Sequence, residues 1–192
     1  MSCAGCKVHD GFFDTWISLQ AQIVQELRRL RSAHPSAPLY VTGHSLGGAV
    51  ATLGSYVLAN DLNIPVTATY TYGSPRVGNQ AFAEAQRTGH NQWRATHHRD
   101  IVPHLPPETL FGFRHTAREV FYDDDSHAGH VCDGTGEDSS CSMQYKVLLS
   151  VSDHLNYFGE TIGEDGCGEG KSSFSKHTRA ATAAAARRRR VR

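Results

Sequence analysis

The sequence predicts an α/β fold in which a mostly parallel β-sheet carries helices on both of its faces. Stretches with the composition of helices and of strands alternate over residues 13–98, as parallel sheets with crossover helices require. A second observation is VTGHSLGGAV at residues 41–50, where a glycine-rich turn joins a short apolar run to a helix-like one. The length of 192 residues suits one domain with a sizeable core.

Composition and periodicity assign the first elements in order. An amphipathic helix is predicted over residues 13–30, because apolar residues recur there at intervals of three and four. The stretch AHPSAP ends this helix, since proline cannot continue it. A short buried strand at residues 39–43 then leads into a helix of small and apolar residues at 45–60.

The next strand is predicted at residues 64–75, which are rich in β-branched and aromatic residues and are stopped by Gly73 and Pro75. A helix at 79–89 and a strand at 91–98 complete the alternating part of the chain.

The pattern changes after residue 104. Residues 113–124 read as a strand that forms a hairpin with another strand, and residues 127–142 read as a loop. Residues 143–158 are expected to form a turn or helix that carries a histidine.

The chain is expected to divide into a globular domain at residues 1–159 and a low-complexity tail at 160–192. The tail has almost nothing apolar to bury and is predicted to be disordered. Residues 171–192 contain eight of the 19 basic residues and no acidic residue, although the formal net charge is zero. The remaining acidic body would repel phosphate groups, so no nucleic-acid binding is expected there. No run of 18 apolar residues is present, so no transmembrane segment is predicted.

The cysteines are typical of an extracellular chain. Cys3 and Cys6 are close together, and Cys132 and Cys141 flank a Gly-, Asp- and Ser-rich stretch, so each pair could close a short loop. The alternative is a set of reduced thiols in a cytosolic protein. Cys167 has no evident partner, and the N-terminal residues lack the apolar core of a signal peptide. Together these features suggest that a further N-terminal segment precedes the sequence.

The stretch GHSLG fits the G-x-S-x-G pattern of a nucleophile elbow. In such an elbow a strand turns sharply into a helix and exposes the serine hydroxyl, here that of Ser45. Gly43 and Gly47 lack a Cβ and would let strand and helix approach each other. His44 is interpreted as a packed, hydrogen-bonded residue. The alternative is a glycine-rich turn with an incidental serine.

A serine nucleophile needs a histidine that accepts its proton and a carboxylate that orients the histidine. Asp100 follows a predicted strand and would lie at the same sheet edge as Ser45, and His154 lies further along the chain. This gives the order serine, acid, histidine. Residues 123–125 and Asp153 are competing acids, but none follows a parallel strand as directly.

A metal site is the alternative role for one histidine-rich stretch. His97, His98, Asp100 and His104 are close in sequence, but their spacing has no fixed helical or hairpin frame. We therefore predict neither a metal site nor a cofactor.

Four stretches in this order, VTGHSLGGAVATL, YTYGSPRVGN, THHRDIVPHLPP and DHLNYFG, resemble the fungal triacylglycerol lipase family, which also contains feruloyl esterases. CKVHDGFFDTW and CDGTGEDSSCS resemble two further segments of these enzymes. The resemblance extends from about Cys3 to Gly159. It implies a partial α/β-hydrolase fold, hydrolysis of carboxylic esters, often at a lipid–water interface, and secretion.

The resemblance also implies roles for individual residues. Ser45 would be the nucleophile, Asp100 the triad acid and His154 the base, while the backbone N–H of Leu46 would be one oxyanion donor. Disulfides would join two pairs, Cys3 with Cys6 and Cys132 with Cys141. The family's early strands, lid and second oxyanion donor have no counterpart before Cys3, so an N-terminally truncated member is expected.

These features favour a serine carboxylic ester hydrolase, and within that class a triacylglycerol lipase of lipid catabolism. Three alternatives stay open: a feruloyl or short-chain esterase, a catalytically impaired remnant that folds and binds lipid or a partner, and a fragment without a stable fold.

Overall fold

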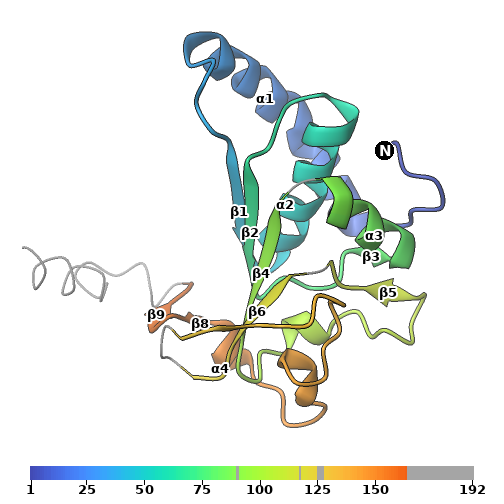
Figure 1. Ribbon diagram of the computed structural model, residues 1–192, viewed down its shortest axis with the longest axis vertical. Coiled ribbons are helices and arrows are strands. Elements are labelled where there is room, and N and C mark those ends of the chain that lie inside the picture. The colour runs from blue at the N-terminus through green and yellow to red at the C-terminus, as the bar shows by residue number, and fades with distance from the viewer. Residues whose placement is uncertain (90, 117, 125–127, 164–192) are drawn as a thin grey trace, which may run out of the picture.

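A five-stranded sheet forms the centre of the computed structural model, which describes residues 1–163 apart from residues 90, 117 and 125–127 (Figure 1). The strands lie in the order β1-β2-β4-β6-β7. The first four are mutually parallel and only β7 is antiparallel. The mostly parallel sheet that the sequence predicts is therefore confirmed. The bounds of the five strands are Tyr40–His44, Ala68–Tyr72, Gln92–His97, Glu119–Tyr122 and His130–Val131.

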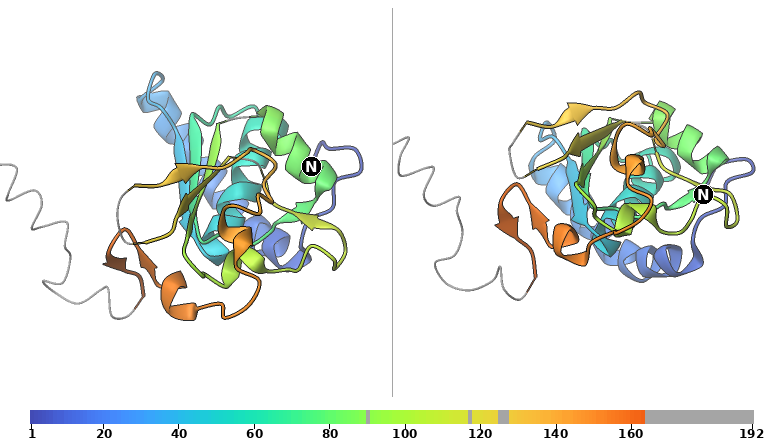
Figure 2. Two further views of the ribbon diagram at one scale, coloured as in Figure 1. Left: turned by 60° about the horizontal axis from the view of Figure 1, so that its bottom comes forward. Right: turned by 90° about the horizontal axis from the view of Figure 1, so that it is seen from below.

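Three long helices form a layer on the sheet. Helix α2 (Leu46–Tyr56) packs on β1 and β2, and α1 (Asp10–Ala33) packs on α2. The α1–α2 contact is close, because a Cβ on Gly54 would lie 2.6 Å from the Trp16 ring. Helix α3 (Gln80–Gly89) also packs on α2, where the Phe82 ring contacts that of Tyr56. Figure 2 shows α3, in green, beside α2.

The opposite sheet face, where the sequence also predicts helices, is less well covered. Side chains alternate between the two faces along a strand, so Tyr70 of β2, which is 39% exposed, faces away from the α2 layer if its fully buried neighbours Thr69 and Thr71 face it. The three long helices thus cover one face of the sheet. No helix in the described part of the chain has the length and apolar character needed to cross a membrane.

The predicted single strand at 113–124 is in fact two strands in different sheets. Strand β5 (Phe113–Arg114) pairs with β3 (Gly78–Asn79), whereas β6 belongs to the central sheet. The interruption has a local cause. The backbone N–H of His115 donates a hydrogen bond to Glu137, and Arg118 adopts a φ of 63°. Strand β7 pairs antiparallel with β6 and is the partner in the hairpin that the sequence predicts. It lies within the predicted loop at 127–142 and is only two residues long, so the sequence does not indicate its position.

Short elements complete the described chain at the carboxyl ends of the parallel strands (Figure 1). Their bounds are Val102–His104 and Ser142–Gln144 (3-10 helices), Val151–His154 (α4), Asn156–Tyr157 (β8) and Glu160–Thr161 (β9). At the opposite end of the sheet, Val57–Asp61 continues α2 as a π-helix. The β8–β9 hairpin crosses the domain boundary that the sequence predicts at residue 159. The rest of the predicted tail, with Cys167, lies outside the described residues.

Candidate active site

Ser45 occupies the turn between β1 and α2 and has the strained backbone of an elbow. Its φ of 56° and ψ of −127° are unusual for a residue with a side chain. The approach of strand and helix depends on Gly43, because a Cβ there would lie 2.2 Å from the carbonyl oxygen of Gly47. At Gly47 itself a Cβ would meet no atom within 4 Å. The sequence predicts that both glycines let strand and helix approach each other. In the structure only Gly43 is needed for this approach.

Helix α2 begins at Leu46, directly after the serine. The first N–H groups of a helix have no acceptor within it and carry a partial positive charge. The Leu46 N–H is thus available to an anion that forms beside Ser45.

Asp100 and His154 form a buried pair. Nδ1 of His154 donates a hydrogen bond of 2.9 Å to Oδ2 of Asp100, and these residues are 7% and 1% exposed. The other carboxylate oxygen, Oδ1, accepts a 2.8 Å hydrogen bond from the Val102 backbone. The carboxylate is therefore fixed from both sides, and its bond to Nδ1 leaves Nε2 of His154 as the free ring nitrogen.

Backbone contacts bring the two partners together across 54 residues of sequence. Asp100 forms a parallel β-bridge with Ser150, the residue that precedes α4. The Ser150 N–H donates to the Arg99 carbonyl at 2.8 Å, and the Ser150 side chain accepts from the Asp153 N–H at the start of α4. The helix that carries His154 is thereby held beside the end of β4.

His44 connects the elbow to this pair. Its Nε2 donates a 2.8 Å hydrogen bond to the His154 carbonyl, and the two rings stack with centroids 4.4 Å apart. Burial lowers the pKa of His44, which favours the neutral ring. The structure thus gives His44 the packed position expected of it. Within the described residues, the Ser45 hydroxyl itself makes no hydrogen bond to His154; such contacts are often long in free enzymes.

Two residues at the site were not expected from the sequence. The hydroxyl of Tyr157 donates to Oδ2 of Asp100 at 2.7 Å, and burial together with the Asp100 charge raises the pKa of Tyr157 well above its usual value. Gly73 has a φ of 54°, and a Cβ there would lie 2.6 Å from Oδ2 of Asp100 and 2.9 Å from Nδ1 of His154. The only sequence signals were a glycine after a strand and a tyrosine three residues beyond the histidine.

The competing candidates have other partners. Oδ2 of Asp153 lies 2.9 Å from Nδ1 of His98, and Asp123 accepts a hydrogen bond from Tyr145. Burial alone would raise the pKa of Asp153, but hydrogen bonds from the Arg99 backbone and Ser150 outweigh it and lower the pKa. In residues 1–163, apart from the gaps given above, His97, His98 and His104 do not gather into a metal-binding cluster.

Four cysteines form two disulfides, Cys3 with Cys6 and Cys132 with Cys141. The first lies at the N-terminus, and the second closes the loop after β7.

Comparisons with known sequences point to one family. The family model described as Lipase (class 3) matches residues 1–110. A lipase of Rhizomucor miehei is 41% identical over 165 residues, which make up 83% of this chain and 45% of that protein. The secreted mono- and diacylglycerol lipase 1 of Fusarium solani is 42% identical over 164 residues, 81% of this chain and 47% of that protein. The chain thus spans about half the length of these curated relatives.

Solved structures give the same result for the fold. Lipase II from Rhizopus niveus matches with a TM-score of 0.78 and 36% identity, over 83% of this chain and 61% of that one. A triacylglycerol lipase whose catalytic centre is described as a serine protease triad matches with a TM-score of 0.78 and 40% identity, over 84% of this chain and 63% of that one.

Proposed function

The chain belongs to the class 3 lipase family, and we propose that it hydrolyses carboxylic esters, with triacylglycerols as preferred substrates, through an acyl-enzyme on Ser45. The observation that carries the proposal is the buried Asp100–His154 pair, at 2.9 Å, whose histidine stacks on the residue preceding Ser45. The family relation and the strained elbow at Ser45 support the same assignment.

In the proposed reaction Nε2 of His154 accepts the Ser45 proton as the hydroxyl oxygen attacks the ester carbonyl carbon. Asp100 holds the Nδ1–H tautomer and stabilises the imidazolium that forms. The Leu46 N–H donates to the carbonyl oxygen as it becomes negative. His154 then protonates the departing alcohol, and water releases the acid by the same steps.

The proposed substrate is an acylglycerol at a lipid–water interface. Two exposed apolar residues adjoin the candidate site in sequence, Leu46 after the serine and Leu155 after the histidine, and they favour an apolar acyl chain. The relatives named above are themselves lipases. We further propose that the chain is secreted, as the two disulfides and the Fusarium relative suggest, and that residues 1–159 act as one lipase-like domain apart from the tail.

An active-site fluorophosphonate tests the nucleophile. It should label the chain once, at Ser45 as located by peptide mass spectrometry, because only an activated serine reacts readily. Ser45→Ala should abolish labelling, whereas Ser18→Ala, at an exposed position of α1, should leave it unchanged. A chain that unfolds cooperatively on heating yet takes no label would contradict the proposal and favour a folded, inactive relative that binds lipid.

The substrate class needs a separate measurement. Emulsified long-chain triacylglycerol should be hydrolysed faster than feruloyl esters or short-chain esters in solution. The reverse order would refute the triacylglycerol assignment but not the serine hydrolase assignment.

A further inference from the structure

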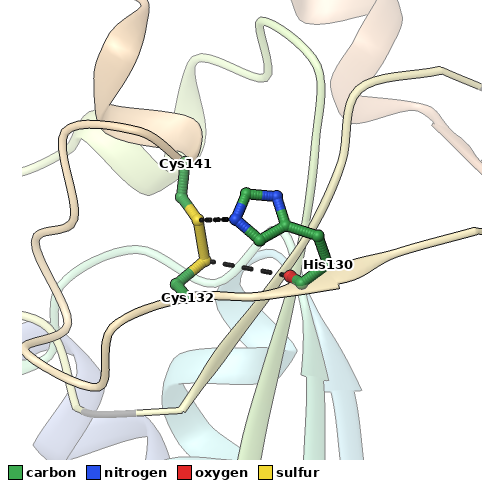
Figure 3. Close-up of side chains that lie close together, drawn as sticks. All are labelled: His130, Cys132 and Cys141. Atoms are coloured by element: carbon green, nitrogen blue, oxygen red, sulfur yellow. Dashed lines mark hydrogen bonds between the residues drawn. A yellow bond between two sulfur atoms is a disulfide. The ribbon is translucent and has the colours of Figure 1, made fainter.

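A second cluster of reactive side chains lies on the far edge of the sheet, at β7. Figure 3 shows the imidazole of His130 beside the Cys132–Cys141 disulfide. Nε2 of His130 is 3.4 Å from Sγ of Cys141, and the three possible ligand atoms lie within 4.8 Å of one another. Among the described residues this is the only group of its kind.

We propose that reduction of the Cys132–Cys141 disulfide turns this cluster into a Zn²⁺ site with His130 as the third protein ligand. Two thiolates and one imidazole are a common zinc ligand set, and water or a carboxylate commonly takes the fourth position. This site is independent of the ester hydrolysis proposed above.

A dithiol can reduce the Cys132–Cys141 disulfide. The dithiol gives two electrons and two protons to the disulfide, whose S–S bond breaks to give two thiols, while the dithiol closes to a cyclic disulfide. Zn²⁺ then displaces one proton from each thiol, and the neutral Nε2 of His130 supplies its lone pair. The oxidised pair cannot bind in this way because its sulfurs carry no thiolate charge.

Contacts other than the disulfide hold the two cysteines in place. The Cys132 N–H donates a 3.0 Å hydrogen bond to the Glu119 carbonyl, and the Ser142 N–H, next to Cys141, donates to the Glu119 carboxylate at 3.2 Å. Glu119 belongs to β6 and is almost fully buried. Both ends of the loop are therefore anchored on one residue of the central sheet.

The middle of the loop is anchored as well. Arg76 forms an ion pair of 2.7 Å with Glu137, and Arg94 donates a 3.0 Å hydrogen bond to the Gly136 carbonyl. These bonds do not depend on the oxidation state of the sulfurs, so the loop should keep its course after reduction.

The remaining geometry suits a tetrahedral ion. Two thiolates bound to one Zn²⁺ lie ~3.8 Å apart, and the Cα atoms of Cys132 and Cys141 are 6.3 Å apart, which side-chain rotation can accommodate. Oδ2 of Asp138 lies 3.8 Å from Sγ of Cys141, near the position of a fourth ligand. The ring of Phe121 packs edge-on against His130 and keeps its imidazole beside the sulfurs.

The test uses the full chain with Cys3, Cys6 and Cys167 replaced by serine, so that Cys132 and Cys141 are its only cysteines. A phosphine reduces the disulfide to two thiols and becomes the phosphine oxide, with water supplying the oxygen atom and the two protons, so no competing thiol is left in solution. Co²⁺ is then added as a spectroscopic probe. We expect the intense visible absorption of tetrahedral thiolate coordination, at one Co²⁺ per chain, and its loss when Zn²⁺ displaces Co²⁺. The unreduced chain should give no such absorption.

Two variants separate the proposed ligand from a general effect. His130→Asn should weaken Zn²⁺ affinity by more than the roughly 10- to 100-fold that loss of an outer-shell partner causes. His34→Asn, at an exposed position after α1, should leave affinity unchanged. A reduced, folded chain without the cobalt absorption would overturn the proposal, and so would equal affinity in the His130→Asn variant.

If reduction unfolds the chain, thermal unfolding in the presence of Zn²⁺ tests the proposal instead. Zn²⁺ should then restore a cooperative thermal transition, because binding and folding are coupled when the apo site is not formed. Failure of Zn²⁺ to restore the transition would likewise overturn the proposal.

Discussion

The hydroxyl of Tyr157 donates a hydrogen bond of 2.7 Å to Oδ2 of Asp100. This is the same oxygen that accepts the hydrogen bond from His154. A buried carboxylate needs such donors, because burial removes the water that would otherwise stabilise its charge. Tyr157 lies in the hairpin strand β8, so the hairpin that follows α4 is also a support of the candidate active site.

Tyr157→Phe should therefore reduce both stability and catalysis. Losing a hydrogen bond to a charged acceptor should lower the free energy of unfolding by about 1.5–3 kcal/mol. The less firmly held Asp100 should reduce kcat for a short-chain ester roughly tenfold, the equivalent of about 1.4 kcal/mol. Urea unfolding and steady-state kinetics measure the two effects. Tyr145→Phe removes a tyrosine–aspartate bond of exposed groups instead and should change neither quantity appreciably. Equal behaviour of the two variants would argue against a supporting role for Tyr157.

Gly73→Ala should disrupt the Asp100–His154 pair. The new methyl group would lie 2.6 Å from Oδ2 of Asp100, and a displacement of about 1 Å at a reacting group can reduce the rate on the order of 100-fold. Gly112→Ala is the matched control, since Gly112 has a φ of 69° but no atom within 4 Å of the added Cβ. Both variants carry the backbone strain of about 1–2 kcal/mol, whereas only Gly73→Ala should lose ester hydrolysis. Full activity of Gly73→Ala would exclude the proposed pair from catalysis.

The two elbow glycines should respond differently to alanine. Gly43→Ala would bring a methyl group within 2.2 Å of the Gly47 carbonyl oxygen, which is backbone and cannot rotate away. We expect this variant to lose its cooperative thermal transition or all fluorophosphonate labelling. Gly47→Ala places a methyl group in open space and should keep both. If instead Gly47→Ala is the more damaging change, strand and helix do not approach each other at Gly43.

His115 should make stability depend on pH. Burial, reinforced by the nearby charges of Arg94 and Arg76, lowers the pKa of His115 well below its usual value of 6.5. Below about pH 6.5, His115 binds a proton in the unfolded chain but stays neutral in the folded chain. The resulting contribution to stability is fully present above about pH 6.5 and is lost as the pH falls, by about 1.4 kcal/mol per pH unit.

Urea unfolding at several pH values between about 4.5 and 7.5, bracketing the ordinary histidine pKa, measures this slope. His115→Asn should be less stable at neutral pH, because it loses the 2.6 Å hydrogen bond to the Pro103 carbonyl, but its stability should fall less steeply with acid. His34→Asn, at an exposed position, should retain the wild-type slope. A wild-type slope in His115→Asn would mean that other groups cause the acid sensitivity.

Much of the fold could be predicted from the sequence because its signals are local. The repeated apolar spacing over residues 13–30 predicts most of α1, which extends three residues further at each end, and the parallel strands follow from their alternation with helices. Glycine and serine spacing likewise indicated the turn at Ser45. The two-residue strands β5 and β7 could not be predicted in this way, because only partners distant in sequence define elements so short.

The sequence by itself thus determined the kind of protein: an α/β chain of the class 3 lipase family, with a serine at a strand–helix turn. Only the tertiary structure decided which side chains meet. The bridge from Asp100 to Ser150 joins segments far apart in the chain, and it selects His154 for Asp100 while Asp153 pairs with His98. The same folding brings Tyr157 to Asp100 and His130 to the Cys132–Cys141 disulfide. Periodicity and motifs report local conformation, whereas a contact across the sheet depends on register and on the course of the loops.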